Sequence, residues 1–508
     1  MSAAFRSLCF TSSFAFRYDL LRVNAFDWRA EFPAIMSNGG FDAVIGNPPY
    51  IRIQALKEWA PLEVELYKEL YRAAGKGNYD IYVVFVEKAL SLLNERGRMG
   101  FILPHKFFNA KYGEPLRGVI AEGKHLSQIV HFGDQQVFAG ATTYTCLLFL
   151  EKGVQEEFEF VNVTSLDRWR QGEPQLQGHL PSDHLMSSEW SFTVGEGAAL
   201  MDKLKQVRPT LGEIAHLFVG LQTDADDVYI LELVREEDSV TYCQSAFTGL
   251  VHAFESAHLK HFVKGSVNIR RYFLSSLTKR LIFPYETVWG RSVLIDSKKY
   301  AIEYPLTWAY LNECKKRLTA RNKGAMSGPE WYGYVYRKNH TRLDSPKLLV
   351  PSLANRSTFV PDLEGKYFFA GSGGGGGGGY GVSLPPDSQV SYMYLLGVLN
   401  SSISNYFLRA TSTTFRGGYL ALNRQYIEQL PIRTIDFNDP TDVKHHDETV
   451  ALVTRMLELH KRLGVERNPQ VKTVVQRQIE ATDRQIDWLV YRLYGLTEAE
   501  IRIIEDAT

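Results

Sequence analysis

Four consecutive residues, Asn47-Pro48-Pro49-Tyr50, combine the groups with the clearest chemical potential in this sequence. The two proline rings fix φ at about −65° and lack an N–H, so the segment is rigid. It therefore holds the Asn47 amide and the Pro48 carbonyl as a fixed pair of acceptors, which suits an exocyclic amino group whose two hydrogens each need a partner. The Tyr50 ring offers a face to the attached base, and flipped bases are bound by such edge hydrogen bonds and stacking.

The alternative interpretation of these four residues is a tight turn that ends a strand. The apolar run FDAVIG (41–46) directly before Asn47 predicts a buried strand. Open α/β sheets bind their ligands at the carboxyl ends of such strands, and this position favours the functional interpretation.

The elements that must position this segment are alternating strands and helices in the first 150 residues. Helical spacing in 79–95 predicts a helix that stops at Gly97, and the apolar runs 99–104, 129–133 and 142–152 predict strands. This alternation predicts an α/β sheet covered by helices. From about 210 to 435 the chain is rich in short strands, Tyr, Gly and Pro, and from 441 onward the helical period returns.

The composition excludes several classes of protein. The 508 residues are 45% hydrophobic and 22% charged, which allows sizeable buried cores. The 57 Lys+Arg balance the 57 Asp+Glu, so a wholly basic coat for nucleic acid is excluded. The 4 cysteines form no CxxC pair, which excludes a disulfide scaffold and predicts a cytoplasmic location. No apolar run reaches the roughly 18 residues that a membrane span requires.

Several segments resemble one family of enzymes. FDAVIGNPPYIRIQ (41–54) resembles the signature of amino-methyltransferases that act on adenine in DNA, and 77–107 resembles the segment that follows it in the gamma class. HFGDQQVFAGATTYTCLLFLEK (131–152) resembles the late sheet motif of these enzymes. Residues 210–435 resemble a TaqI-type target-recognition domain, and the tail resembles the closing segment of type IIG restriction–modification enzymes of the Eco57I/TaqI kind.

This resemblance implies a fold and a division of the chain. It implies an α/β fold with a partial Rossmann-like methyltransferase sheet, a mostly β recognition domain and a C-terminal helical segment. The implied boundaries are 1–155 for the catalytic domain, 156–209 for a connector, 210–435 for the target-recognition domain and 436–508 for the helical segment.

The resemblance also implies a reaction. A methyl group would pass from S-adenosylmethionine to the N6 nitrogen of a flipped adenine in double-stranded DNA, as part of a restriction–modification system. Asn47 and Pro48 would accept the two amino hydrogens, Pro49 would stiffen the loop, and Tyr50 and Phe138 would flank the flipped ring. No metal is expected.

The front of the chain departs from the family pattern. A glycine-rich cofactor loop is expected many tens of residues before Asn47, but the first glycine here is Gly39. The segment VNAFDW (23–28) resembles the stretch that contacts the adenine ring of the cofactor, through Phe26, with Ala25 where a carboxylate is expected; a core strand and turn is the alternative. We therefore expect little cofactor binding by this chain alone and an upstream methyltransferase or nuclease polypeptide as its partner.

Two other functions remain open at this stage. The chain could be a non-catalytic DNA-binding specificity fragment whose cofactor half is supplied by another polypeptide. An RNA or protein-glutamine methyltransferase shares the Asn-Pro-Pro-Tyr chemistry but would not need so long a recognition domain.

Two basic stretches predict contacts with DNA phosphates, which fix the register of a protein on the duplex. Residues 258–280 hold six basic residues and no acid, and 315–342 hold eight basic residues against Glu330 alone, interleaved with Trp331, Tyr332, Tyr334 and Tyr336. A solvated charged face is the alternative. The residues assigned to DNA are Lys260, Lys264, Arg270, Arg271, Lys279, Arg280, Arg337 and Lys338.

Three remaining motifs are given other interpretations. Pro361-Asp362 and Glu364-Gly365-Lys366 contain the pieces of a nuclease metal site, but they abut each other and are predicted to be a loop. His445-His446-Asp447 is predicted to be a helix cap rather than a set of metal ligands. The glycine tract 373–379 is predicted to be a flexible linker, with a tight loop close to the DNA backbone as the alternative.

Overall fold

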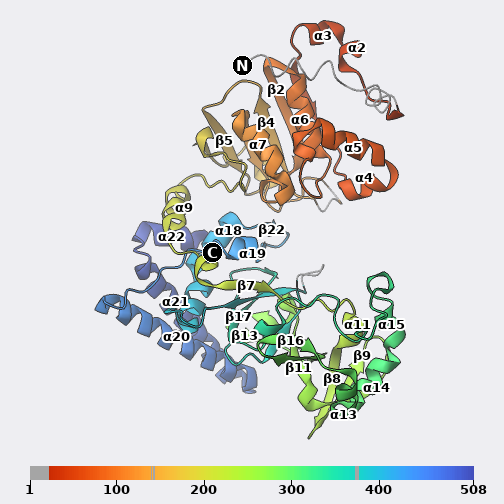
Figure 1. The fold of residues 1–508 in the computed structure, drawn as a ribbon. Helices are drawn as coiled ribbons and strands as arrows, with labels where there is room; N and C mark the ends of the chain where they lie inside the picture. The colour runs from red at the N-terminus through yellow and green to blue at the C-terminus, as the bar shows by residue number, and fades with distance from the viewer. Residues whose placement is uncertain (1–21, 139, 141–142, 372–376, 508) are drawn as a thin grey trace. The chain divides into compact units, whose positions relative to one another are not determined.

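The computed structural model describes residues 22–138, 140, 143–371 and 377–507, and the chain divides into two compact units, 1–198 and 199–508 (Figure 1). Most of the glycine tract, residues 373–376, lies outside the described residues, so neither interpretation of it is tested. No helix in the described part of the chain combines the length and the apolar character that a membrane-spanning segment requires.

Unit 1 is built on one mixed sheet with the strand order β1-β2-β4-β3-β5-β6. The strand β1 runs parallel to β2, β3 runs parallel to β5, and the pairs β2–β4, β4–β3 and β5–β6 are antiparallel. The strands are β1 (Phe41–Gly46), β2 (Leu93–Pro104), β3 (Leu126–His131), β4 (Thr145–Glu151), β5 (Glu157–Asn162) and β6 (Leu176–Pro181).

Helices of unit 1 flank this sheet in its described residues, and α6 and α7 lie across it (Figure 1). Apolar side chains of α6 such as Val83, Val86 and Leu90 are buried in the core of the unit, as the helical spacing predicts. The helices are α2 (Trp28–Glu31), α3 (Pro33–Ser37), α4 (Ile53–Trp59), α5 (Pro61–Leu70), α6 (Tyr82–Leu92), α7 (Glu114–Glu122) and α8 (Leu166–Arg170).

The end of α6 differs from the sequence prediction. The helix stops at Leu92, and Leu93 already pairs with Phe41 at the start of β2. The reason lies at Gly97, where an added Cβ would come within 2.6 Å of the Phe41 carbonyl oxygen. Only glycine allows the two strands to approach so closely, and this pairing replaces the last helical turn.

Unit 2 begins with a set of mostly antiparallel sheets. They have the orders β10-β9-β8-β14-β11-β20, β19-β17-β21-β7 and β18-β23-β22, with the two hairpins β12–β13 and β15–β16. The strands are β7 (His216–Val219), β8 (Ile230–Glu237), β9 (Val240–Ser245), β10 (Val251–Glu255), β11 (Leu259–Val263), β12 (Ile269–Arg270), β13 (Phe273–Leu274), β14 (Lys279–Ile282), β15 (Tyr285–Val288), β16 (Arg291–Leu294), β17 (Lys347–Pro351), β18 (Leu353–Ala354), β19 (Val360–Asp362), β20 (Tyr367–Phe369), β21 (Gly379–Ser383), β22 (Thr414–Phe415) and β23 (Tyr419–Ala421).

Unit 2 also contains helices along its whole length, and the long α20 and α21 lie side by side at its C-terminal end (blue in Figure 1). The helices are α9 (Gly197–Gln206), α10 (Leu211–Ile214), α11 (Asp226–Tyr229), α12 (Gly265–Asn268), α13 (Ser297–Glu303), α14 (Pro305–Glu313), α15 (Lys315–Thr319), α16 (His340–Leu343), α17 (Tyr392–Asn400), α18 (Ser402–Thr411), α19 (Arg424–Ile427), α20 (Pro440–Val465), α21 (Pro469–Leu493) and α22 (Glu498–Ala507).

The N-terminus of α20 corrects one prediction. Asp439 is the N-cap, since its side chain accepts from the Thr441 N–H, and Pro440 is the first helical residue. The segment His445-His446-Asp447 therefore lies inside α20 and is not its cap. Proline favours the first helical position, which is why the helix starts earlier than expected.

The predicted fold class is confirmed. The described chain contains an α/β sheet with parallel strands, then mostly antiparallel sheets, then C-terminal helices.

Candidate functional site

The Asn-Pro-Pro-Tyr segment follows β1 without a gap, at the carboxyl end of the strand. Pro48 is buried and Pro49 is half-buried, whereas Asn47 is exposed. The prolines thus anchor the segment to the protein while the Asn47 amide faces outward, which is the arrangement required of a group that binds a ligand.

The Tyr50 ring is fixed from two sides. Its hydroxyl donates a hydrogen bond of 3.0 Å to the Ile102 carbonyl in β2, and its ring meets Tyr82 of α6 edge-on with centroids 6.4 Å apart. Burial, together with the buried Cys146, raises the pKa of Tyr50 to about 12. The phenol therefore stays protonated at neutral pH and can position a ligand but cannot serve as a base.

A cavity of about 660 Å³ lies beside this segment. Asn47, Pro48 and Pro49 contribute to its wall together with Phe26, α5 and α6. The structure therefore brings Phe26 to the same cavity as Asn47. Phe138 is not among the lining residues; it lies in the segment after β3 and is 38% exposed.

Phe26 stands just before α2 with its ring 57% exposed. Trp28 contacts the ring edge-on at a centroid distance of 4.9 Å, and Asp27 caps α2 by accepting from the N–H groups of Arg29 and Ala30. Ala25 also lines the cavity. This edge of the cavity offers an aromatic face with no carboxylate at position 25.

Sequence reasoning missed a pair of histidines at the ends of β2 and β3, two strands that lie on either side of β4. His105 follows β2, His131 ends β3, and their ring centroids lie 4.5 Å apart. The backbone N–H of His105 donates to the Tyr144 carbonyl, while Nδ1 of its ring has no hydrogen-bond partner within the described chain. The sequence did hold a signal for this site. His105 directly follows the apolar run 99–104, just as Asn47 directly follows the run that forms the parallel strand β1.

Both histidines are held neutral. Burial lowers the pKa of His131 to about 4, and burial with the nearby His131 lowers the pKa of His105 well below its ordinary value. The unfolded chain therefore binds more protons than the folded chain as the pH falls from about 6.5 to about 4.

We predict that the free energy of unfolding decreases across that pH range and that the slope is smaller in His131→Gln, which cannot take up the proton. Urea titrations at pH 7, 6 and 5 would measure both. An equal slope in the variant and the wild type would contradict the assignment to His131.

The first basic stretch divides into exposed and internal residues. Arg270 is exposed and its guanidinium donates to the Ser266 and Ile269 carbonyls, while Lys260 lies over the Phe368 ring at 5.5 Å. The other basic side chains of this stretch are Lys264, which is half-buried, and Lys279 and Arg280, which pair with Glu232 and Glu236.

Arg271 points the other way. Its side chain is only 15% exposed, forms an ion pair of 2.5 Å with Asp483 of α21 and donates to the Asn400 carbonyl at 2.9 Å. The sequence prediction assigned Arg271 to a DNA phosphate. In the structure Arg271 instead connects the β12–β13 hairpin to the C-terminal helices, because the fold brings the carboxylate of Asp483 next to its guanidinium.

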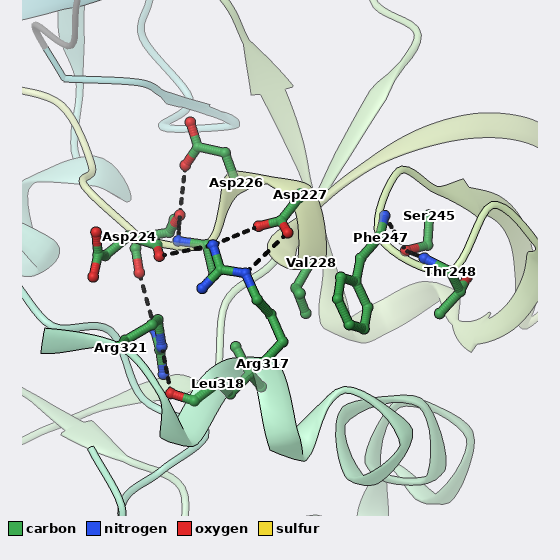
Figure 2. A network of polar contacts seen from close by, with 12 residues as sticks. Asp224, Asp226, Asp227, Val228, Ser245, Phe247, Thr248, Arg317, Leu318 and Arg321 are labelled. Atoms are coloured by element: carbon green, nitrogen blue, oxygen red, sulfur yellow. Dashed lines mark hydrogen bonds and ion pairs between the residues drawn. The ribbon is translucent and has the colours of Figure 1, made fainter. Parts of the chain in front are cut away.

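The second basic stretch is also partly internal. Figure 2 shows Arg317 donating to both carboxylate oxygens of Asp227, at 3.1 Å each, and Arg321 donating to the Leu318 carbonyl. Arg321 further donates to the Thr223, Trp331 and Gly333 carbonyls. These two arginines therefore hold loops of the protein together.

The aromatic residues of this stretch are mostly core residues. Trp331, Tyr332 and Tyr334 are buried, and only Tyr336 is well exposed, at 52%. These three rings are therefore part of the core of unit 2 and not of an exposed aromatic surface. Arg337 and Lys338 are exposed, and Arg337 pairs with Glu330.

The residues that resembled a nuclease site have a structural role. Asp362 ends β19 and forms a buried ion pair of 2.5 Å with Lys347 of β17, and its carboxylate also accepts from the N–H groups of Lys366 and Tyr367. Neither carboxylate nor amine is exposed by more than 1%. The carboxylate is fully engaged in closing the turn between β19 and β20.

Comparison with known proteins follows the division of the chain. Residues 17–138 match the Eco57I restriction-modification methylase family, and residues 295–432 match the TaqI-like C-terminal specificity domain.

Two curated relatives match most of this chain. The type II restriction enzyme and methyltransferase RM.Eco57I of Escherichia coli is 28% identical over 96% of this chain and 49% of its own length. The type II methyltransferase M.PaeR7I of Pseudomonas aeruginosa is 25% identical over 91% of this chain and 72% of its own. The chain thus spans about half the length of RM.Eco57I.

Among solved structures, the type IIL restriction-modification enzyme MmeI in complex with DNA has a similar fold. Its TM-score is 0.58 at 12% identity, and the match covers 95% of this chain and 58% of that one.

Proposed function

We propose that this chain, whose residues 17–138 belong to the Eco57I restriction-modification methylase family and whose residues 295–432 belong to the TaqI-like specificity domain family, methylates the N6 nitrogen of an adenine at a specific site in duplex DNA. One observation carries the proposal. The Asn-Pro-Pro-Tyr segment lies at the carboxyl end of β1, on the wall of a cavity that Phe26 also lines.

The chemistry follows from the two acceptors of the segment. The adenine amino nitrogen carries two hydrogens, and Asn47 Oδ1 and the Pro48 carbonyl would each accept one of them. These bonds raise the electron density on the nitrogen and fix the direction of its lone pair, and the nitrogen gains the methyl group and releases one proton to solvent water. Fixed orientation and preorganised dipoles supply the rate, without a covalent intermediate on the protein.

The flipped adenine also needs aromatic neighbours. Tyr50 is held rigidly by Ile102 and Tyr82, so its ring can bind a base without first being ordered. We assign the second ring face to the partly exposed Phe138.

S-adenosylmethionine supplies the methyl group when it is bound. The residues of the cavity suit the adenine half of this cofactor, since the exposed Phe26 ring and the apolar Ile45 and Trp28 form a wall for a planar base. Phe26 would hold that ring by stacking.

The outer edge of β1 supports the proposal of an additional strand. No strand pairs with this edge among the described residues, and Ile45 in β1 is 86% exposed. Strands of parallel sheets are normally covered on both faces, and an open edge is a template for pairing. We propose that β1 pairs with a further methyltransferase strand, from the same or another polypeptide.

The proposed function is tested by incubating the chain with labelled S-adenosylmethionine and duplex DNA and by analysing the digested DNA for N6-methyladenine. Methylated adenine is the expected product once the further methyltransferase strand completes the sheet, and little of it is expected from the chain alone. Specific DNA binding without methyl transfer would favour the non-catalytic specificity fragment, and methylated cytosine would contradict the adenine assignment.

The two neighbouring arginines of the β12–β13 hairpin give a sharper test of the DNA contacts. Arg270→Ala should weaken binding to all duplexes alike and lower the slope of log affinity against log salt by about 0.9, the value for one phosphate contact. Its thermal stability should not change, because Arg270 is exposed.

Arg271→Ala is the matched control. It should lower stability, because it leaves the partly buried Asp483 without its ion-pair partner. Salt titrations of binding and thermal melts of both variants would check the contrast. A reduced salt slope in Arg271→Ala with unchanged stability would contradict the internal role of that residue.

A further inference from the structure

The hairpin of β15 and β16 carries an unusual residue at its tip. Val288 pairs with Arg291, so Trp289 and Gly290 alone form the turn. Both residues have positive φ, 52° for Trp289 and 73° for Gly290. A two-residue turn with this conformation strongly prefers Asn-Gly or Asp-Gly. A bulky side chain in the left-handed region is a genuine outlier, because its Cβ comes too close to the following carbonyl oxygen.

Trp289 gains nothing from the rest of the protein in return. Its side chain is 98% exposed. The folded protein therefore exposes a large aromatic ring to water, at a turn position whose backbone conformation is unfavourable for tryptophan. Backbone strain of this kind often occurs at functional sites. An exposed ring at the end of a hairpin can insert between groups of a bound molecule.

The base of the hairpin is rigid. Tyr285 is buried and its hydroxyl accepts from the Tyr334 N–H at 2.5 Å, and Ser292 bonds to His340 at 3.2 Å. Lys299 forms an ion pair of 2.6 Å with Glu286. The tip is thus presented by a fixed support, so that little conformational entropy is lost when it binds.

The surroundings of the tip favour a nucleic acid over a protein. The apolar surface is confined to Trp289 and the partly exposed Val288 and Val293, which is too small for the roughly 800 Å² per partner of a standard protein interface. Arg291 beside the turn is exposed and pairs with no carboxylate among the described residues. The exposed Arg337 lies over the Tyr285 ring at 5.8 Å, at the base of the hairpin, where it also pairs with Glu330.

From these observations we infer that Trp289 is a DNA-contacting wedge, whose ring stacks against bases of the duplex while Arg291 and Arg337 contact the adjacent phosphates. Apolar side chains that enter base steps in this way bend the duplex and bring more of it against the protein. The inference rests on the proposed function, because it requires that unit 2 bind DNA.

The test uses the turn itself as its control. Trp289→Asn supplies a preferred turn residue and should fold at least as stably as the wild type, but it should bind a labelled mixed-sequence duplex roughly 5- to 150-fold more weakly, the range for loss of one stacked base. Trp289→Phe should retain most of the affinity. Trp488→Ala, which removes another exposed tryptophan at 52%, should leave the affinity unchanged.

Tryptophan fluorescence provides the direct readout. The difference between wild type and Trp289→Asn isolates Trp289, which should be open to acrylamide in the free protein and shielded in the complex. Equal affinity of Trp289→Asn and wild type, or a Trp289 that stays open to acrylamide in the complex, would overturn this inference alone. A wild type that binds no duplex would remove the DNA function with it, whereas binding without methyl transfer would count only against the proposed reaction.

Discussion

Asn47→Ala should methylate DNA about 10²–10³-fold more slowly than the wild type, the scale for loss of one oriented polar contact in a transition state. Asn47 is exposed at the end of β1, so its amide is available to the substrate and its removal leaves no buried group unsatisfied. The affinity for DNA should barely change, because contacts with the DNA phosphates contribute most of the binding free energy.

The rate would be measured under single-turnover conditions, so that product release does not hide the effect on the chemical step. Tyr50→Phe is the matched control. It removes only the hydrogen bond to Ile102 and keeps the ring and its contact with Tyr82, so its rate should fall far less than that of Asn47→Ala. Methylation by Asn47→Ala at the wild-type rate would show that another group accepts the amino hydrogens.

The second large effect concerns stability. Asp362→Ala should lower the free energy of unfolding by about 3–5 kcal/mol, because it leaves the Lys347 ammonium buried and unpaired. Burial lowers the pKa of Lys347, and Asp362 opposes that shift. The remaining acceptors of the amine are the Leu343 and Ser345 carbonyls, at 2.6 and 3.3 Å, which do not neutralise its charge.

The double variant Lys347→Met/Asp362→Leu separates the charge from the shape of the site. Since apolar residues of similar volume often replace a buried ion pair without loss, it should recover most of the stability. Urea unfolding followed by circular dichroism would compare the single and double variants. A double variant as unstable as Asp362→Ala would indicate that packing or the turn hydrogen bonds, rather than the unpaired charge, determine the loss.

The elements that could be predicted from the sequence are those with a local cause. The run 41–46 forms β1 as expected, because a short apolar segment followed by two prolines has few alternatives. The strand is not buried as predicted, however, since it lies at the edge of the sheet and none of its residues is buried. The same apolar run predicted that Asn47 lies directly after the strand. The last turn of α6 could not be predicted, because Leu93 and Gly97 take part in strand pairing with residues about 50 positions earlier.

The basic stretches show the other limit of sequence reasoning. Arg270 and Arg271 are adjacent and chemically identical, yet one is exposed and the other meets Asp483, 212 residues away. Likewise Tyr332 and Tyr334 are buried although charged residues surround them in the sequence. Local composition cannot distinguish exposed from internal side chains here, because the tertiary fold determines which partner each side chain contacts.

Contacts between the first and the last helix of unit 2 determine when this unit can complete its folding during translation. Lys203 of α9 pairs with Glu500 of α22 across 297 residues, and Leu200 and Leu204 share one core with Ile486 and Ile504. The core of unit 1, in contrast, uses residues between 53 and 194. At about 5–20 residues per second, roughly 15–60 s of translation separate the two ends of the Lys203–Glu500 contact. Unit 1 can therefore fold on the ribosome while the front of unit 2 waits for its C-terminal helices, and in that interval its apolar side chains depend on chaperones for protection.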